Sequence, residues 1–477
     1  MIKKFLGLTV GACFAVGVCY AASGSQEAKA VLQKAQMTIG SLNSVQFSGT
    51  GVNGQFGQSM AAGKEWPRRD LESVTGSINY EQRSAKLEFV FKEEVFQGRR
   101  QNTHVNGDRA WTVRANGVGP QLASANERQL QIWMTPHGFV RAGLAASDVA
   151  VTSRTAGGQK VNVVSFTVMN KYKLEGIIEA SGLVTRVETR FPNPVLGDMP
   201  YSFAYSDYKD FSGSKFPARI LQSADGFAVN DLTISSVQPN APVDIPVPAE
   251  VQSASIPAVK VATTKLGDGI WFVAGGSHHS VIVEFDKFLA VIEAPQNEAR
   301  SLAVIAEAKR LVPNKPIQYL VNTHHHFDHS GGLRTYVAEG ATIVTHVSNR
   351  AYWEKALAAP ATLAPDAQTT ARRKPRIQTV VNDGKYVITD GKQSIEVYGT
   401  TGDSHTDELL IAYLPSVKAL VEADSFAAGD PTNVVEDELA LKKNIERHKL
   451  DIATIVGIHG TGPVPFEEFI KDIARAR

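Results

Sequence analysis

The pattern of apolar residues changes early in the chain from helical to alternating. Apolar residues from Ala28 to Ala35 recur at helical spacing, which predicts one amphipathic helix over Gln26–Ile39. After it, short stretches alternate apolar and polar positions between turn residues, and each predicts a strand. These stretches include Ser44–Gly49, Lys86–Phe91, Val161–Val168, Leu183–Thr189 and Tyr201–Tyr208. We therefore expect a separate, mainly antiparallel β domain with an N-terminal helix over residues 25–238.

A second pattern begins after a proline-rich stretch. Residues 239–257 contain five prolines, which predicts an extended, semi-rigid linker. Beyond it, the helical spacing of Glu298–Leu311 precedes the apolar strand Ile317–Val321, and strands then alternate with helices to the end. Such alternation is typical of an α/β layer structure. We expect a second domain, of α/β type, over residues 258–477.

Length and charge narrow the class of protein. A chain of 477 residues is too long for one ordinary core, so two or three domains are expected. Lys and Arg number 49 against 48 Asp and Glu. This balance gives no electrostatic basis for nucleic-acid binding, and we expect a small-molecule substrate instead.

The first residues have the pattern of an export signal. Lys3 and Lys4 precede the mostly apolar stretch Phe5–Val18, and small residues follow at Ala21 and Ala22. This order predicts a signal peptide over residues 1–22, and hence a periplasmic or secreted protein. An N-terminal membrane anchor is the alternative, although the apolar stretch is short for a span.

Both cysteines, Cys13 and Cys19, lie inside this segment. Their surroundings loosely resemble lipid-attachment sites, so a lipoprotein is a further alternative. Cleavage after Ala21 or Ala22 leaves a chain without cysteine. Such a chain forms no disulfide and offers neither a thiolate metal ligand nor a cysteine nucleophile.

The densest group of histidines directly follows the strand Ile317–Val321. His324 and His326 are two residues apart at a strand end, so their side chains project to the same side. The turn that follows brings Asp328 and His329 next to them. Imidazole and carboxylate groups suit Zn²⁺, so this stretch predicts a metal site.

Three further ligand-type residues follow apolar strands downstream. His405 comes after the strand Ser394–Tyr398, and Asp424 and His459 each end an apolar strand. Since strand ends meet at one edge of a sheet, these side chains are expected to join the first group. Enough ligands are then present for a second metal.

The stretch from His324 to His329 matches the H-x-H-x-D-H pattern of the metallo-β-lactamase superfamily. Residues 258–477 as a whole resemble a domain of this superfamily. The resemblance implies a four-layer αββα sandwich that binds two Zn²⁺ per chain. It assigns one metal to His324, His326 and His405, the other to Asp328, His329 and His459, and Asp424 to both.

The resemblance also implies a reaction. Two metals that share a water lower its pKa toward about 7, and the resulting hydroxide attacks a carbonyl carbon or a phosphorus. Asp328 is the candidate catalytic residue, which orients the nucleophile or carries a proton. We expect an exported zinc-dependent hydrolase of an ester, lactone, lactam or related acyl substrate.

Departures from the family pattern leave alternatives open. Glu293 stands where the family has an Asp that supports the metal loop, and we expect it to play that part with a longer arm. True β-lactamases usually have Cys or Ser in place of Asp424, which makes a β-lactamase the alternative rather than the first expectation. Persulfide dioxygenases, which bind one iron, have a similar ligand set, and iron or manganese could replace zinc.

The first domain resembles a different family. The strand pattern of Tyr201–Ile220 is coarsely similar to that of lipoprotein-sorting carriers. This resemblance implies a curved sheet around an apolar ligand and a contact with lipid or the cell envelope. The non-enzyme alternative is thus an envelope carrier protein with a vestigial metal site.

The remaining histidines lie outside the predicted ligand set. His278 and His279 are predicted either to contact substrate or to lie in an exposed turn, because that turn flanks the site in the superfamily. His325 is expected to point away from the metals. His137, like His104 and His448, is expected at the surface.

Overall fold

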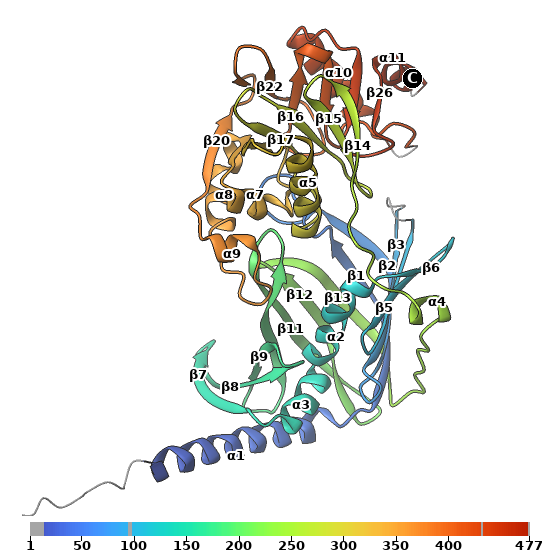
Figure 1. Cartoon of the computed structure of the whole chain (residues 1–477). Coiled ribbons are helices and arrows are strands. Elements are labelled where there is room, and N and C mark those ends of the chain that lie inside the picture. The colour runs from blue at the N-terminus through green and yellow to red at the C-terminus, as the bar shows by residue number, and fades with distance from the viewer. Residues whose placement is uncertain (1–13, 94–97, 431–432, 476–477) are drawn as a thin grey trace, which may run out of the picture. The chain divides into compact units, whose positions relative to one another are not determined.

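The computed structural model describes residues 14–93, 98–430 and 433–475 (Figure 1). Its contacts divide the chain into two compact units. The first unit comprises Met1–Asn53, Arg69–Arg190 and Pro200–Ile256, and the second Gly54–Arg68, Phe191–Met199 and Pro257–Arg477. Two short segments from the N-terminal half therefore belong to the second unit. Neither unit is one continuous range of residues.

The first unit is built on one 13-stranded sheet, in the order β6-β5-β4-β3-β2-β1-β13-β12-β11-β10-β9-β8-β7. Every pairing described within it is antiparallel. Its strands are β1 (Ser44–Gly54), β2 (Arg68–Asn79), β3 (Ser84–Phe91), β4 (Arg100–Asn106), β5 (Arg109–Arg114), β6 (Gly117–Pro120), β7 (Ala150–Ala156), β8 (Gln159–Val168), β9 (Tyr172–Ile178), β10 (Val184–Asn193), β11 (Gly197–Phe211), β12 (Ser214–Ala224) and β13 (Phe227–Pro239). The prediction of a separate antiparallel β domain is confirmed.

The N-terminal helix α1 (Phe14–Ile39) buries one face, as its sequence predicts. Ala28, Leu32, Ala35 and Ile39 lie three or four residues apart and are fully buried. The helix contacts α3 (Pro136–Ala145) and the strands β7 and β12. This apolar stripe is what fixes the helix to the sheet.

Two helices that the strand pattern did not predict follow β6. The short helix η1 (Leu122–Ser124) leads directly into α2 (Ala125–Met134). Thr135 then joins α2 to α3. The Thr135 hydroxyl accepts a hydrogen bond from Gly138 N (3.1 Å), and Pro136 takes the first helical position. A threonine cap followed by proline is a local start signal that the sequence does contain.

His137 contradicts the expectation of a surface position. Its side chain is buried, 4% exposed, and its Nε2–H donates to the carbonyl of Ile39 (3.2 Å). The ring also stacks on Phe216. Because α3 was not predicted, the sequence pattern did not indicate that His137 lies on the buried face of a helix.

The stretch predicted as a linker packs on the first unit. It contains the short helix α4 (Ala249–Gln252), and Val243, Ile245 and Val251 are buried against Trp111 of β5. Asn79 and Asn106 donate hydrogen bonds to the carbonyls of Val243 and Ile245. The stretch predicted as an extended, semi-rigid linker is therefore held against the first unit by apolar contacts and hydrogen bonds.

The second unit contains two mixed sheets. The seven-stranded sheet has the order β14 (Ala262–Gly267), β15 (Ile270–Ala274), β16 (Ser280–Glu284), β17 (Leu289–Ile292), β18 (Ile317–Val321), β19 (Thr342–His346) and β20 (Arg376–Val380). The six-stranded sheet has the order β21 (Lys385–Thr389), β22 (Ser394–Gly399), β23 (Leu410–Leu414), β24 (Ala419–Glu422), β25 (Thr454–Gly457) and β26 (Pro463–Pro465). β17 to β20 run parallel, as does the pair β24 and β25.

Helices cover the outer faces of both sheets. The helices of this unit are α5 (Glu298–Leu311), α6 (Phe327–Ser330), α7 (Leu333–Glu339), α8 (Arg350–Ala356), α9 (Ala367–Ala371), α10 (Val435–Arg447) and α11 (Phe466–Arg475), with the short helices η2 (Val347–Asn349) and η3 (Pro415–Val417). One apolar core joins the two sheets, a second lies under α5, α7 and α8, and a third lies under α10 and α11. This is the predicted four-layer αββα sandwich.

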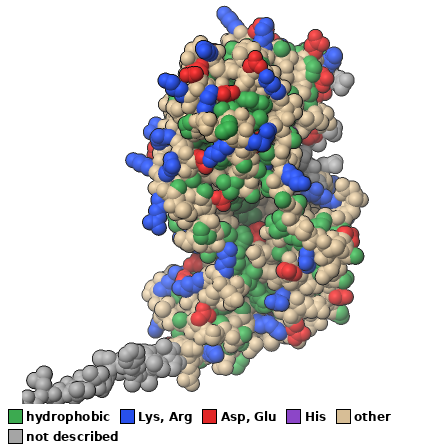
Figure 2. Space-filling model, viewed as in Figure 1, with side chains coloured by type: hydrophobic (Ala, Val, Ile, Leu, Met, Phe, Trp, Pro, Cys, Tyr) green, Lys and Arg blue, Asp and Glu red, His purple; other side chains and the backbone are tan. Residues whose placement is uncertain are grey.

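The predicted signal segment falls mostly outside the described part of the chain. Residues 1–13 are not described, and residues 14–22 belong to the backbone of α1. Among the described residues, no helix combines the length and apolarity needed to cross a membrane. On the face shown in Figure 2, basic and acidic side chains are interspersed.

Candidate metal centre

The candidate ligands stand on loops that follow the strands of both sheets in the second unit. His324 and His326 follow β18, and Asp328 and His329 lie in the short helix α6 directly after them. The remaining three belong to the six-stranded sheet, where His405 lies after β22, Asp424 after β24 and His459 after β25. The facing strand ends bring all seven predicted residues into two groups.

The first group consists of His324, His326, His405 and Asp424, whose ligand atoms all lie within 4.8 Å of one another. The Nε2 atoms of His324 and His405 are 3.2 and 2.9 Å from Asp424 Oδ2. His326 Nδ1 is buried without a hydrogen-bond partner among the described residues. A buried nitrogen atom left without a partner is costly, and a cation held by the group would satisfy it.

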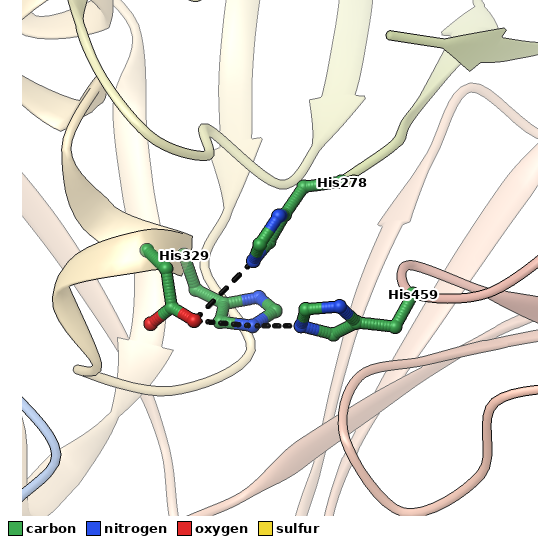
Figure 3. A group of neighbouring side chains, drawn as sticks. His278, His329 and His459 are labelled. Atoms are coloured by element: carbon green, nitrogen blue, oxygen red, sulfur yellow. Dashed lines mark hydrogen bonds and ion pairs between the residues drawn. The ribbon is translucent and has the colours of Figure 1, made fainter. Parts of the chain in front are cut away.

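The second group consists of His278, Asp328, His329 and His459, again within 4.8 Å of one another. His329 Nε2 lies 3.1 Å from His459 Nε2, and His278 Nε2 lies 3.3 Å from Asp328 Oδ2. Figure 3 shows the three imidazoles converging from separate loops. The group contains the three predicted residues and adds His278, which the sequence left between a substrate contact and a turn.

Asp424 touches both groups. Its Oδ2 is 3.0 Å from His329 Nε2, and its Oδ1 is 2.7 Å from His459 Nε2. The same carboxylate faces the imidazoles of the first group. Its backbone is in the left-handed region (φ 66°), which an aspartate adopts only where its surroundings require it. Asp424 therefore has the position that a residue shared by two metals must have.

Outer contacts fix the orientation of the imidazoles. Glu293 accepts hydrogen bonds from Thr323 N (2.7 Å) and from His329 Nδ1–H (2.8 Å), the supporting part expected of it. His326 donates its Nε2–H to the carbonyl of Ser59 (3.0 Å). A ligand imidazole whose far nitrogen is held in this way presents its other nitrogen to a metal.

Burial and charge set the protonation of the two groups. Burial lowers the pKa of His324 to about 3 and that of His278 to about 4, so both are neutral near pH 7. Burial would raise the pKa of Asp424, but the imidazoles of His329 and His405 hold it well below its usual range. Neutral imidazole and ionised carboxylate are the forms that bind a metal.

Asp424 has the opposite effect on two of the imidazoles. Burial would lower the pKa of His329 and His405, but the carboxylate of Asp424 raises both. The same concentrated negative charge that draws protons onto these rings attracts a divalent cation.

The segment Gly54–Arg68 forms part of the site, although it connects β1 and β2. Gln58 Nε2 donates to Asp328 Oδ1 (2.8 Å), and the amide of Phe327 donates to the carbonyl of Gly57 (3.2 Å). A Cβ at Gly57, where φ is +85°, would lie 2.9 Å from the Phe327 ring. This contact could not be predicted from the sequence, because the segment is some 270 residues away from the site along the chain.

Further contacts of this segment are aromatic and polar. Phe56, Trp66 and Phe327 form an edge-to-face cluster with ring centroids 5.3 to 5.7 Å apart. The Ser59 hydroxyl lies 2.9 Å from His325 Nε2, and Glu408 bonds the other nitrogen of this ring. His325 thus points away from both metal groups, as expected, and ties the segment to the loop that carries the ligands.

Fold and site together define a domain that can hold two metal ions at the edge of a β-sandwich. Residues 273–457 match the model of the metallo-beta-lactamase superfamily. The chain therefore carries a domain of this superfamily, whose members are metal-dependent hydrolases. His459 lies just beyond the matched range.

No curated protein matches the chain. The chain is similar to a metallo-beta-lactamase from Pontibacter korlensis, with 18% identity over 45% of this chain and 98% of the other and a TM-score of 0.35. It is also similar to a metallo-beta-lactamase from Hirschia baltica, with 17% identity over 45% and 97% and a TM-score of 0.34. For the DIM-1 metallo-beta-lactamase the corresponding values are 13%, 45%, 97% and 0.35.

Proposed function

We propose that the protein is an exported hydrolase that uses two zinc ions to cleave an ester, lactone, lactam or related acyl substrate. The observation that supports this most directly is the pair of ligand groups that share Asp424. His326 Nδ1, which is buried without a partner among the described residues, adds to it. A histidine with no metal-binding part would pair this nitrogen with a protein group.

The residues have separate parts in this proposal. His324, His326 and His405 hold one zinc, and Asp328, His329 and His459 hold the other, with Asp424 shared. When bound, the two ions supply a Lewis acid and a water whose pKa is near 7. Asp328 is the residue that orients this water or carries its proton, since its side chain remains 37% exposed while Asp424 is only 10% exposed.

Metal analysis of the purified protein, followed by a panel of chromogenic esters, lactones and lactams, tests the proposal. We expect two zinc ions per chain and turnover of at least one acyl class, which a chelator abolishes and zinc restores. A protein that binds no divalent metal, or whose turnover is unaffected by its removal, would contradict the proposal.

Asp424 favours a substrate other than a β-lactam. The family resemblance implies that true β-lactamases usually have Cys or Ser at this position, so lactam turnover is expected to be weak beside that of an ester or lactone. The rival enzyme is an iron-dependent sulfur dioxygenase. Iron as the bound metal, together with oxygen consumption on a persulfide, would favour that rival.

Export is part of the proposal and has its own test. Fractionation of cells that produce the full chain, followed by N-terminal sequencing, is expected to find a mature protein in the periplasm or medium that begins near Ser23. A full-length protein that stays in the cytoplasm would contradict it.

We further propose that the first unit binds an apolar ligand. A mostly apolar pocket of about 100 Å³ lies between its sheet and α2, and its lining includes Phe47, Ile78, Leu87 and Leu232. This volume suits a small apolar group. Ala85→Trp would fill the pocket and is expected to abolish binding of an apolar fluorescent probe, whereas Ala228→Trp at an exposed position of β13 should not. Equal binding by both variants would contradict an apolar site here.

A further inference from the structure

The loop between β15 and β16 carries a histidine pair whose two members have different surroundings. His278 and His279 are both buried, 7% and 5% exposed. Both ring nitrogens of His279 face the backbone, since Nδ1 accepts from Gly275 N (3.4 Å) and Nε2–H donates to the Gly460 carbonyl (3.0 Å). His279 thus holds two loops together, and His278 is the member whose Nε2 faces a candidate metal ligand, Asp328.

The position of His278 Nε2 fits a metal ligand. It lies 3.3 Å from Asp328 Oδ2, and His329 Nε2 lies 3.1 Å from His459 Nε2. Four atoms arranged tetrahedrally at the usual zinc–nitrogen distance are about 3.3–3.4 Å apart. Two of the distances within the second group are therefore close to the spacing that such an ion imposes, and all four ligand atoms lie within 4.8 Å of one another.

The far nitrogen of the ring is held in the way typical of metal-bound imidazoles. His278 Nδ1 lies 2.8 Å from the hydroxyl of Ser277, and that hydroxyl accepts a hydrogen bond from Gln296 Nε2 (3.1 Å). The Ser277 oxygen retains an acceptor site for His278 Nδ1–H. With the proton on Nδ1, the lone pair of Nε2 would be available to a metal ion held between His278 and Asp328.

A buried arginine fixes the loop that carries His278. The Arg300 side chain of α5 is 1% exposed and donates to the carbonyls of Val273 (3.2 Å), Gly275 (3.3 Å) and His278 (3.3 Å). A Cβ at Gly275 would lie 2.6 Å from the guanidinium, so glycine is required there. The hydrogen bonds of the buried guanidinium hold the loop in one conformation. His278 is therefore in position before a metal binds.

From these contacts we propose that His278 is a fourth protein ligand of the second metal, beside Asp328, His329 and His459. This proposal rests on the proposed function in assuming that the centre binds metal. With Asp424 shared, the second metal has five protein ligands and the first has four. The second metal then has fewer positions left for water, and we expect it to be the more tightly held of the two.

Metal titration of the full chain and of His278→Ala tests this proposal. Co²⁺ is added to metal-free protein, and its visible spectrum and native mass are followed at each step. Wild-type protein is expected to bind two ions. His278→Ala should weaken one of the two Co²⁺-binding steps by about 10–100-fold or more. This is the range seen when a residue that only supports a metal ligand is removed. The visible spectrum should change at that step only.

Two further variants separate a ligand from a supporting residue. His279→Gln, next in the chain, should bind both ions as the wild type does. His278→Gln can still donate a hydrogen bond to Asp328 but is a poor metal ligand, so it should resemble His278→Ala. If His278→Gln instead binds both ions with wild-type affinity and spectrum, His278 only orients Asp328 and the proposal is wrong.

The same experiment distinguishes the two levels of inference. A wild-type chain that binds no Co²⁺ and shows no metal-dependent turnover contradicts the proposed function itself. A wild type that binds two ions and turns over substrate, beside a His278→Ala variant with unchanged binding, contradicts only the assignment of His278.

Discussion

Single residues decide whether the two ligand groups act as one centre, and Asp424 has the largest part in this. Its carboxylate lies within 3.2 Å of imidazole nitrogens from both groups, and it adopts a left-handed backbone conformation. Glu293 shares that conformation (φ 71°) and supports His329 from behind. Strain of this kind persists only where the surrounding structure holds it, and here it lies at the proposed centre.

Replacing one imidazole of the first group tests whether metal and activity depend on each other. His326→Ala removes a ligand whose Nδ1 is buried among the other ligands and has no protein partner. We expect the variant to lose the first metal and all turnover together while remaining folded. Zinc content and rate are measured on the same preparation, and turnover that persists at unchanged zinc content would rule out the proposed mechanism.

Glu293 allows a milder test of the second group. In Glu293→Gln one carboxylate oxygen becomes an NH₂ group, which must then face either Thr323 N–H or His329 Nδ1–H. Two buried donors in contact are unfavourable, and we expect zinc affinity to fall about 10–100-fold. Competition with a coloured chelator measures this. Glu293→Asp, which keeps the charge, should lose less, and equal losses would show that the second hydrogen bond is unimportant.

At the level of elements, the segment Gly54–Arg68 shows what the sequence could not predict. Local patterns were predictable: α5 and β18 have the predicted bounds, because their apolar periodicity is local. The seven candidate ligands were also predictable from spacing and strand ends. Gln58 and Ser59 were not, since no local pattern relates a turn to a site so distant in sequence. His278 was ambiguous because its partners come from two other segments of the chain.

The contact between Gln58 and Asp328 gives a prediction for this segment. Gln58→Ala removes the donor to Asp328 Oδ1 but leaves the Ser59 carbonyl that supports His326. We expect kcat to fall about tenfold, the equivalent of one hydrogen bond, with zinc content and KM little changed, because Asp328 is less well oriented. Gln55→Ala in the same segment is the matched control. A loss of zinc instead of kcat would make the segment a structural support only.

At the scale of the whole molecule, the two units are stabilised by different chemistry. The second unit gathers imidazoles and carboxylates that favour a bound cation, so its stability depends on metal by mass action. In the first unit, a buried histidine responds to acid. Burial lowers the pKa of His137 to about 4, partly offset by its hydrogen bond to the Ile39 carbonyl. Metal is therefore expected to stabilise the second unit, whereas acid acts on both units, because burial also lowers the pKa of His278 and His324.

The sign of the acid effect follows from the direction of the pKa shift. His137 in the folded state binds a proton only near pH 4, whereas the unfolded chain binds it near 6.5, so unfolding takes up a proton between these values. The free energy of unfolding therefore falls as the pH drops below about 6.5. From His137 alone the loss is about 2 kcal/mol at pH 5 and about 3 kcal/mol once the pH is well below 4.

Urea unfolding at pH 7.5 and at pH 5, with a chelator present so that metal plays no part, measures this loss. His137→Gln keeps a donor for the Ile39 carbonyl and removes the titrating ring, so the first unit of this variant should lose about 2 kcal/mol less than wild type between the two pH values. Burial also lowers the pKa of His104 to about 4, and this less buried ring leaves a smaller residual dependence of the same sign. An identical loss in both proteins would show that His137 does not titrate on unfolding, and that acid acts on the first unit through other groups.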